Sequence, residues 1–201
     1  MEDHLYVWFD TEYSDLDLEA AALMQVAAII TDSAFRRVLP AAGDVCLAVR
    51  LPDGAPLSQF VEEYFERLVA VCRSAAAASL EEADERLCAY VAVALEASGL
   101  PTDARPILAG NSVHADWRLA CRFLPRLARR LHYRHLDVTA FKLEWKLRHP
   151  DEEFVKEDAA AIRTYFPEAI LPDDAGRHDA YYDVQASIAE MTFYRARLLR
   201  P

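Results

Sequence analysis

Apolar residues near the start of the chain form three short, continuous runs. The first, Leu5–Phe9, is typical of a strand buried on both faces of a sheet, and similar runs follow at Leu23–Thr31 and Val45–Leu51. The connections between these runs are too short for a helical crossover. We therefore predict three successive strands that pair as an antiparallel meander.

Helical spacing dominates after this meander. Apolar positions predict a helix over residues 57–69, and Ser79 with Glu82 forms a capping box at the start of a second helix. A short strand at 106–109 leads into a third helix that reaches Leu127, and a last strand follows at 135–138. The acidic segment 149–176 contains a predicted helix at 154–166, and a final helix runs from about Val184 to Leu198. This order predicts a single α/β domain over residues 1–201.

The charge of the chain limits the partners that it can bind. There are 22 Lys and Arg residues against 33 Asp and Glu, which gives a formal net charge of −11. A protein that coats a long nucleic acid needs dense positive charge, so this function is unfavourable. A short nucleic acid remains compatible, because a divalent cation in an acidic pocket can hold its few phosphates.

Cysteine usage and the N-terminus indicate the compartment. The four cysteines are scattered without a CxxC pair, so we interpret them as reduced, mostly buried thiols rather than zinc ligands or disulfides. The N-terminus lacks the basic stretch of a signal peptide, and no apolar run reaches membrane-spanning length. We expect a cytoplasmic protein.

The first candidate for chemistry is the pair Asp10 and Glu12, directly after the first apolar run. Residues two apart on an extended segment project to the same side, so both carboxylates would face one site at the end of the strand. Such a pair suits Mg²⁺ or Mn²⁺, because these cations prefer hard oxygen ligands. Taken alone, however, the pair is more typical of a solvated strand end, where Asp and Glu are common.

Two further candidates lie at the starts of predicted helices. Asp116 falls in the first turn of the helix after residues 110–112, a placement that the helix dipole alone would favour. His178 is expected in the loop before the final helix, and Asp183 in the first turns of that helix. A histidine can accept a proton from water near neutral pH, although a surface histidine and a helix-start aspartate are individually ordinary.

The conjunction of these segments resembles a known family. Four segments carry the resemblance in order along the chain: residues 10–16, residues 110–116, residues 132–139, and the stretch from His178 to Arg195. They are similar to the DEDD exonucleases of the histidine subclass, and along most of the chain to the oligoribonucleases in particular. The resemblance implies an RNase H-like fold, with a mixed five-stranded sheet flanked by helices, and a homodimer.

The resemblance also implies a two-metal hydrolysis of RNA from its 3′ end. By this likeness two divalent cations, Mg²⁺ or Mn²⁺, are held by four carboxylates, while His178 accepts a proton from water. The four carboxylates are those of Asp10, Glu12, Asp116 and Asp183.

Five residues match positions at which the family contacts its substrate. Leu16 matches an apolar wedge between the two bases, and Tyr133 an aromatic residue that reaches across the dimer. Ser112, Arg134 and Thr139 match a cap over the substrate's 5′ phosphate, with Thr139 where serine is usual. Other interpretations stay open: Leu16 as a core contact, Tyr133 as dimer packing alone, and Arg134 as the partner of a nearby acid.

Several departures mark the chain as a divergent member. Ser14-Asp15 stands where the family usually has Thr-Gly, and the segment 61–67 has Tyr64 but no counterpart of a family histidine. We predict an exoribonuclease that degrades RNA dinucleotides and short oligoribonucleotides to nucleoside 5′-monophosphates. Two alternatives remain: the same chemistry on short single-stranded DNA or a signalling dinucleotide, and a non-catalytic module that binds a dinucleotide.

Overall fold

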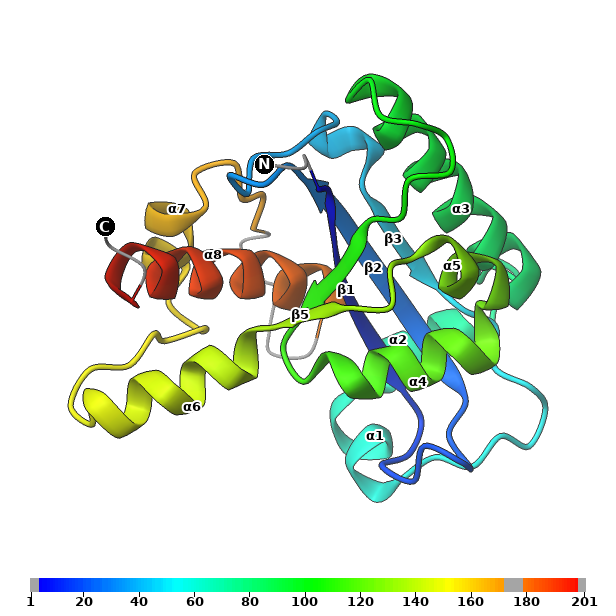
Figure 1. Ribbon diagram of the computed structural model, residues 1–201. Coiled ribbons are helices and arrows are strands. Elements are labelled where there is room, and N and C mark those ends of the chain that lie inside the picture. The colour runs from blue at the N-terminus through cyan, green and yellow to red at the C-terminus, as the bar shows by residue number, and fades with distance from the viewer. Residues whose placement is uncertain (1–3, 172–178, 199–201) are drawn as a thin grey trace.

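A mixed five-stranded sheet forms the centre of the computed structural model, which describes residues 4–171 and 179–198 (Figure 1). The sheet has the order β3-β2-β1-β4-β5, in which β1, β2 and β3 are antiparallel neighbours and β4 and β5 run parallel to β1. This arrangement confirms the predicted meander. The strands are β1 (Tyr6–Tyr13), β2 (Leu23–Thr31), β3 (Val45–Ala48), β4 (Ile107–Gly110) and β5 (His135–Asp137).

Helices cover both faces of the sheet (Figure 1). On one side lie α3, α4 and α5, and on the other α6, α7 and α8, while α1 and α2 lie beside the end of the meander. The helices are α1 (Gln59–Tyr64), α2 (Glu66–Cys72), α3 (Leu80–Ala97), α4 (Val113–Phe123), α5 (Pro125–Arg130), α6 (Val138–Arg148), α7 (Ala159–Tyr165) and α8 (Ala180–Leu198), with a short 3₁₀ turn at Ala41–Gly43.

Two predicted helices are each divided in two. The helix predicted over 57–69 breaks at Phe65, whose backbone (φ −116°, ψ 21°) leaves the helical region and separates α1 from α2. The helix predicted to reach Leu127 breaks at Leu124, directly before Pro125. Proline cannot donate the backbone hydrogen bond that would continue α4, but it is well suited to begin α5.

The segment after β5 differs most from the sequence prediction. Helix α6 was not predicted, because its apolar residues do not follow a single stripe: Trp145 is buried, whereas Leu143 and Leu147 are exposed. The helix predicted at 154–166 is the shorter α7. Asp158 caps its N-terminus by accepting hydrogen bonds from the amides of Ala160 and Ala161. The capping box of Ser79 and Glu82 on α3 is confirmed.

Strand β1 divides its side chains between the two halves of the core. Val7 and Phe9 pack in the cluster that contains α3, α4 and α5, and Trp8 packs in the cluster beneath α6, α7 and α8. Because side chains alternate along a strand, Asp10 and Glu12 follow Trp8 on the α8 side, and Thr11 follows Phe9 on the α4 side. The alternation of side chains along β1 thus decides whether a polar residue faces α4 or α8.

The cysteines are more exposed than predicted. All four are free thiols, in agreement with the absence of a disulfide framework, but Cys46 and Cys121 are exposed and only Cys72 is buried. Helix α4 is amphipathic and Cys121 lies on its outer side, which the sequence prediction did not consider. Within the two ranges that the structure describes, no helix is long and apolar enough to cross a membrane.

Candidate functional site

The pair Asp10 and Glu12 lies inside β1, not at its end as predicted. The strand continues to Tyr13 because its antiparallel pairing with β2 does not stop at Phe9. Glu12 pairs with Gln25, and Tyr13 pairs with Leu23. On the other edge, the parallel pairing with β4 covers Tyr6 to Trp8. The two carboxylates therefore lie just beyond the point where the β1–β4 ladder stops.

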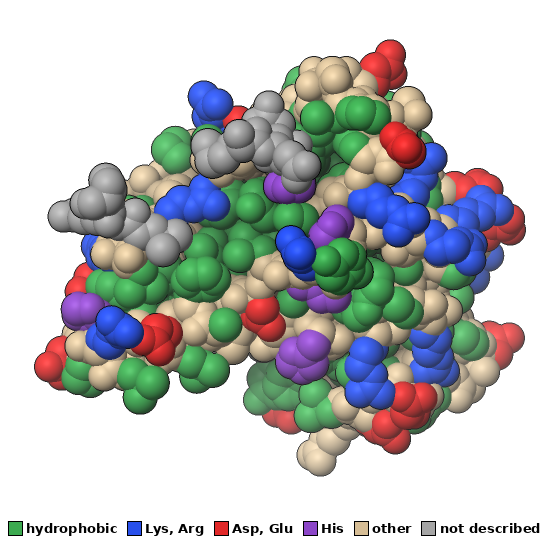
Figure 2. All heavy atoms as spheres, in the orientation of Figure 1, with side chains coloured by type: hydrophobic (Ala, Val, Ile, Leu, Met, Phe, Trp, Pro, Cys, Tyr) green, Lys and Arg blue, Asp and Glu red, His purple; other side chains and the backbone are tan. Residues whose placement is uncertain are grey.

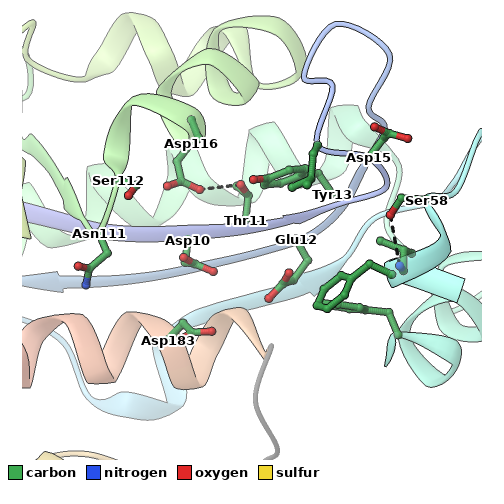
Figure 3. A pocket seen from close by; sticks show the side chains of 15 residues that line it. Asp10, Thr11, Glu12, Tyr13, Asp15, Ser58, Asn111, Ser112, Asp116 and Asp183 are labelled. Atoms are coloured by element: carbon green, nitrogen blue, oxygen red, sulfur yellow. Dashed lines mark hydrogen bonds between the residues drawn. The ribbon is translucent and has the colours of Figure 1, made fainter. Parts of the chain in front are cut away.

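Asp183 approaches this pair from the first turn of α8. Oxygen atoms of Asp10, Glu12 and Asp183 lie within 4.8 Å of one another (Figure 3). The three residues are 173 positions apart at most, so the fold alone brings them together. Hard carboxylate oxygens at this spacing are the ligands that Mg²⁺ and Mn²⁺ prefer, and the donor set fits a divalent metal cation.

Asp116 reaches the site from the opposite side of β1. It lies in the first turn of α4, as predicted, and is 5% exposed. Its Oδ1 accepts a hydrogen bond of 2.6 Å from the hydroxyl of Thr11, the residue between Asp10 and Glu12 (Figure 3). Four acidic side chains from three elements therefore surround one short stretch of β1.

Crowding of carboxylates has a clear electrostatic effect. Burial, and then the charges of Asp116, Asp183 and Glu12, raise the pKa of Asp10 well above its usual range. Burial and neighbouring carboxylates raise the pKa of Glu12 to about 8, and burial raises the pKa of Asp116 to about 7. A bound cation favours the ionised carboxylates, so binding of a cation at this site would release protons.

The turn between β4 and α4 is held in an unusual conformation beside the carboxylates. A Cβ atom on Gly110 would lie 2.8 Å from the carbonyl oxygen of Phe9, so only glycine fits against β1 at this point. Ser112 has a left-handed backbone with φ 50°. Its amide is held by Oδ1 of Asp137 at 3.1 Å and by Oγ1 of Thr139 at 2.8 Å. The turn thereby aims Asn111 and Ser112 at the site.

Asn111 joins this turn to α8. Its amide nitrogen Nδ2 donates to Ser187 Oγ at 2.9 Å and to Glu190 Oε2 at 3.0 Å. Asp183, Ser187 and Glu190 are spaced by four and three residues, which places them on one face of α8. Sequence reasoning included Asn111 in a family-like segment but gave it no role.

A cavity of about 270 Å³ opens over the carboxylates. Leu16 lines it and is 83% exposed, so the alternative of a core contact is wrong for this residue. Phe60, one of the apolar residues of the helix predicted over 57–69, also lines it and is 46% exposed. The lining comprises Asp10, Thr11, Glu12, Tyr13, Asp15, Leu16, Ser58, Phe60, Val61, Phe65, Asn111, Ser112, Ala115, Asp116 and Asp183.

The remaining predicted residues lie around this cavity or outside it. Thr139 borders it, because its hydroxyl is 3.2 Å from that of Ser112 and 3.4 Å from Asn111 Oδ1. Tyr133 and Arg134 do not line it; Tyr133 is 74% exposed, and the Arg134 guanidinium lies 5.3 Å from its ring centre. His178 falls outside the described residues, one position before the hydrogen-bonded Asp179.

Comparison with known proteins gives consistent relatives across nearly the whole chain. An oligoribonuclease of Streptomyces avermitilis is 32% identical, with all of this chain and 90% of the relative aligned. An oligoribonuclease of Alkalilimnicola ehrlichii is 29% identical over 98% of the chain and 91% of its own length. A probable oligoribonuclease of Schizosaccharomyces pombe is 30% identical over 94% and 67%. No model of a protein family matches the chain.

Solved structures with a similar fold are more distant in sequence. Exonuclease I from Methylocaldum szegediense superposes with a TM-score of 0.66 at 18% identity, over 98% of this chain and 41% of that one. Escherichia coli exonuclease I in complex with single-stranded DNA gives 0.65 at 17% identity, over 99% and 42%. This chain thus spans less than half of either structure. The likeness confirms the predicted RNase H-like fold.

Proposed function

The chain belongs to the oligoribonuclease family, and from this premise we propose that it hydrolyses very short RNA from the 3′ end. The products are nucleoside 5′-monophosphates, and the substrates range from dinucleotides to short oligoribonucleotides. One observation carries the proposal: the carboxylates of Asp10, Glu12 and Asp183 converge within 4.8 Å, beside the buried Asp116. We further propose that the enzyme is a cytoplasmic homodimer formed from one domain per chain.

The four carboxylates are the proposed ligands of two divalent cations, Mg²⁺ or Mn²⁺. When bound, such cations supply positive charge that acidifies water and stabilises the charge developing on the phosphate and on the departing oxygen. Thr11 fixes Asp116 for this task through its 2.6 Å hydrogen bond, and β1 fixes Asp10 and Glu12 through its pairing with β2. Three of the four proposed ligands are therefore fixed, two by strand pairing and one by a side-chain hydrogen bond.

His178 is the proposed general base. It accepts a proton from the attacking water, whose oxygen forms a bond to the scissile phosphorus. The bond from phosphorus to the 3′ oxygen breaks, and that oxygen takes up a proton to become a hydroxyl. The next residue, Asp179, fixes the start of α8. Its side chain accepts hydrogen bonds from the Tyr182 amide at 3.0 Å and from Gln25 Nε2 at 3.3 Å.

Substrate contacts follow from the lining of the cavity. Leu16 and Phe60 present apolar surface to the bases, and an aromatic ring suits any base because every base has a π-face. Ser112, Thr139 and Arg134 are the proposed cap for the 5′ phosphate. Tyr133 is the proposed contact across the dimer, in keeping with its 74% exposure in a single chain. A short substrate also agrees with the net charge of −11.

A length series tests this proposal. Turnover is measured on 5′-phosphorylated RNAs of two to seven nucleotides and on matched DNA, in Mg²⁺, in Mn²⁺ and in EDTA. We expect the highest kcat/KM for the RNA dinucleotide and no turnover in EDTA. Comparable rates on DNA or on the longest RNAs would contradict the proposed substrate class. Tight binding of a dinucleotide without turnover would identify a binding module instead.

A further inference from the structure

Helix α8 carries a second acidic residue, Glu190, which lies next to the site but is not one of the proposed metal ligands. Glu190 is fully buried, with an exposure of 0%, and both of its oxygens are held. Oε1 accepts from the Tyr194 hydroxyl at 2.9 Å, and Oε2 accepts from Asn111 Nδ2 at 3.0 Å. Since Asn111 itself lines the cavity, Glu190 stands directly behind the cavity wall.

Two lysines approach this glutamate. Lys142 Nζ of α6 lies 3.9 Å from Oε1 and 3.8 Å from Glu153, so two acids share its charge. Lys156 Nζ lies 4.0 Å from Oε2, on the oxygen that Asn111 also contacts. These distances exceed the usual 2.7–2.9 Å or so of a charged hydrogen bond, so the ammonium groups are attracted to Glu190 without direct donation.

Lys156 is held in place by its backbone. The hydroxyl of Tyr182 donates to the Lys156 carbonyl oxygen at 2.9 Å, and Tyr182 immediately precedes Asp183. Phe154, two residues earlier, is 3% exposed in the core beneath α8. The acidic segment 149–176 thus places the Lys156 ammonium beside Glu190, the residue that binds the Asn111 side chain.

Lys156 keeps part of its side chain open to solvent, with an exposed fraction of 24%, whereas the Glu190 side chain beside it has none. Lysine is scarce in this chain: Lys142, Lys146 and Lys156 are its lysines, and its other cationic side chains are arginines or histidines. A lysine presents a compact point charge that suits a phosphate oxygen.

We propose that Lys156 contacts a phosphate group of the bound oligonucleotide, on the Asn111 side of the cavity. This inference rests on the proposed function. Four carboxylates and two divalent cations would balance in charge, so each phosphate of a substrate adds negative charge that the site must meet from elsewhere. Lys156 supplies that charge, and Glu190 holds its ammonium near the wall while leaving it able to donate.

Kinetics of two dinucleotides test the contact. Lys156→Met, Lys156→Arg and the surface control Lys146→Met are compared with wild type on ApA and on 5′-phosphorylated ApA. We expect Lys156→Met to lose roughly ten- to a hundredfold in kcat/KM, with an unchanged unfolding temperature and partial recovery in Lys156→Arg. An equal loss on both substrates identifies the internucleotide phosphate, and a loss confined to the phosphorylated one identifies the 5′ phosphate. Values within twofold of wild type on both would overturn the contact.

Lysine labelling provides a readout independent of turnover. Wild-type protein is reductively dimethylated in Mg²⁺, with and without adenosine 5′-monophosphate, and each lysine is quantified by mass spectrometry. We expect the nucleotide to protect Lys156 while Lys146 reacts unchanged. Equal labelling of Lys156 in both samples would overturn the proposal. If wild type turned over neither dinucleotide, the proposed function would fail, and this labelling would still decide the role of Lys156.

Discussion

Thr11 Oγ1 donates a hydrogen bond of 2.6 Å to Asp116 Oδ1, joining β1 to α4 across 105 positions of the chain. Thr11 is 5% exposed and Asp116 is 5% exposed, so water competes little for this bond. The bond lowers the pKa of Asp116 against the larger effect of burial, which raises it. Thr11 thus favours the ionised carboxylate and fixes its direction, as a partner behind a metal ligand does.

Replacing Thr11 therefore tests whether Asp116 is a ligand. Thr11→Val keeps the shape of the side chain but removes the hydroxyl, and we expect metal affinity and kcat to fall roughly ten- to a hundredfold. Thr11→Ser keeps the hydroxyl and should retain most of both. Metal affinity is measured by calorimetry, and a Thr11→Val protein that bound and turned over like wild type would remove Asp116 from the ligand set.

Asp10 gives the sharpest separation of activity from stability. Asp10→Asn should reduce turnover by roughly a thousandfold or more, because Asp10 lies at the centre of the carboxylates. In EDTA the same variant should be at least as stable as wild type towards urea, since one of several mutually repelling carboxylates is gone. Asp53→Asn, an exposed loop change, is the matched control and should alter neither. Full activity in Asp10→Asn would refute the metal assignment.

The stability of the metal-free protein should depend on pH in an unusual direction. The pKa of Glu12 rises from 4.5 to about 8 in the folded chain, and that of Asp116 to about 7. Between pH 4.5 and about pH 8 the folded state binds more protons than the unfolded state, so the free energy of unfolding falls as pH rises. We expect the unfolding temperature in EDTA to decrease from pH 5 to pH 8, and Mg²⁺ or Mn²⁺ to remove this trend. A rise over the same interval without metal would contradict the electrostatics of the cluster.

Phe60 should contribute to substrate binding rather than to the fold. It is 46% exposed at the cavity, and loss of a base-stacking ring costs about 1–3 kcal/mol per base. Phe60→Ala should therefore raise KM for a dinucleotide by roughly five- to a hundredfold, with a smaller change in kcat. Val71→Ala on the neighbouring helix α2 is the control, because Val71 is 43% exposed and outside the cavity lining. Equal effects of the two changes would remove Phe60 from the substrate site.

Arg134 distinguishes substrates by their 5′ end. If it belongs to the phosphate cap, Arg134→Ala should weaken binding of a 5′-phosphorylated dinucleotide by roughly tenfold or more and leave the unphosphorylated form nearly unchanged. Arg134→Lys should recover part of the loss. Competition assays with both ligands measure the difference, and similar weakening of both would exclude Arg134 from the cap.

The sequence predicted those parts of the fold that depend on local pattern. The apolar run Leu23–Thr31 coincides with β2, and the capping box of Ser79 and Glu82 starts α3. Helix α6 escaped prediction because its contacts are long-range: Trp145 is buried against Phe193 and Tyr194 of α8, while the neighbouring leucines face outward. Such a pattern has no helical stripe, and only the tertiary fold explains it.

The residues of the candidate site fall into the same two groups, those recognisable from local sequence and those recognisable only from the tertiary fold. Asp10, Glu12, Asp116 and Asp183 could be selected from spacing and resemblance, because each sits in a short motif. Thr11, Phe60 and Lys156 could not, because their significance lies in contacts with residues far along the chain. Phe60 in particular shares the helical spacing of true core residues, such as Val61, and only its 46% exposure separates it from them.

The most direct test is the order in which nucleotides leave a short RNA. A 5′-phosphorylated trinucleotide of sequence A-C-G is incubated with the wild-type protein in Mg²⁺ or Mn²⁺, and the products are identified over time by mass spectrometry. We expect guanosine 5′-monophosphate to be the first nucleotide released, and no release in EDTA. Release of adenosine first, nucleotides with a 3′ phosphate, or unchanged rates in EDTA would contradict metal-dependent hydrolysis from the 3′ end.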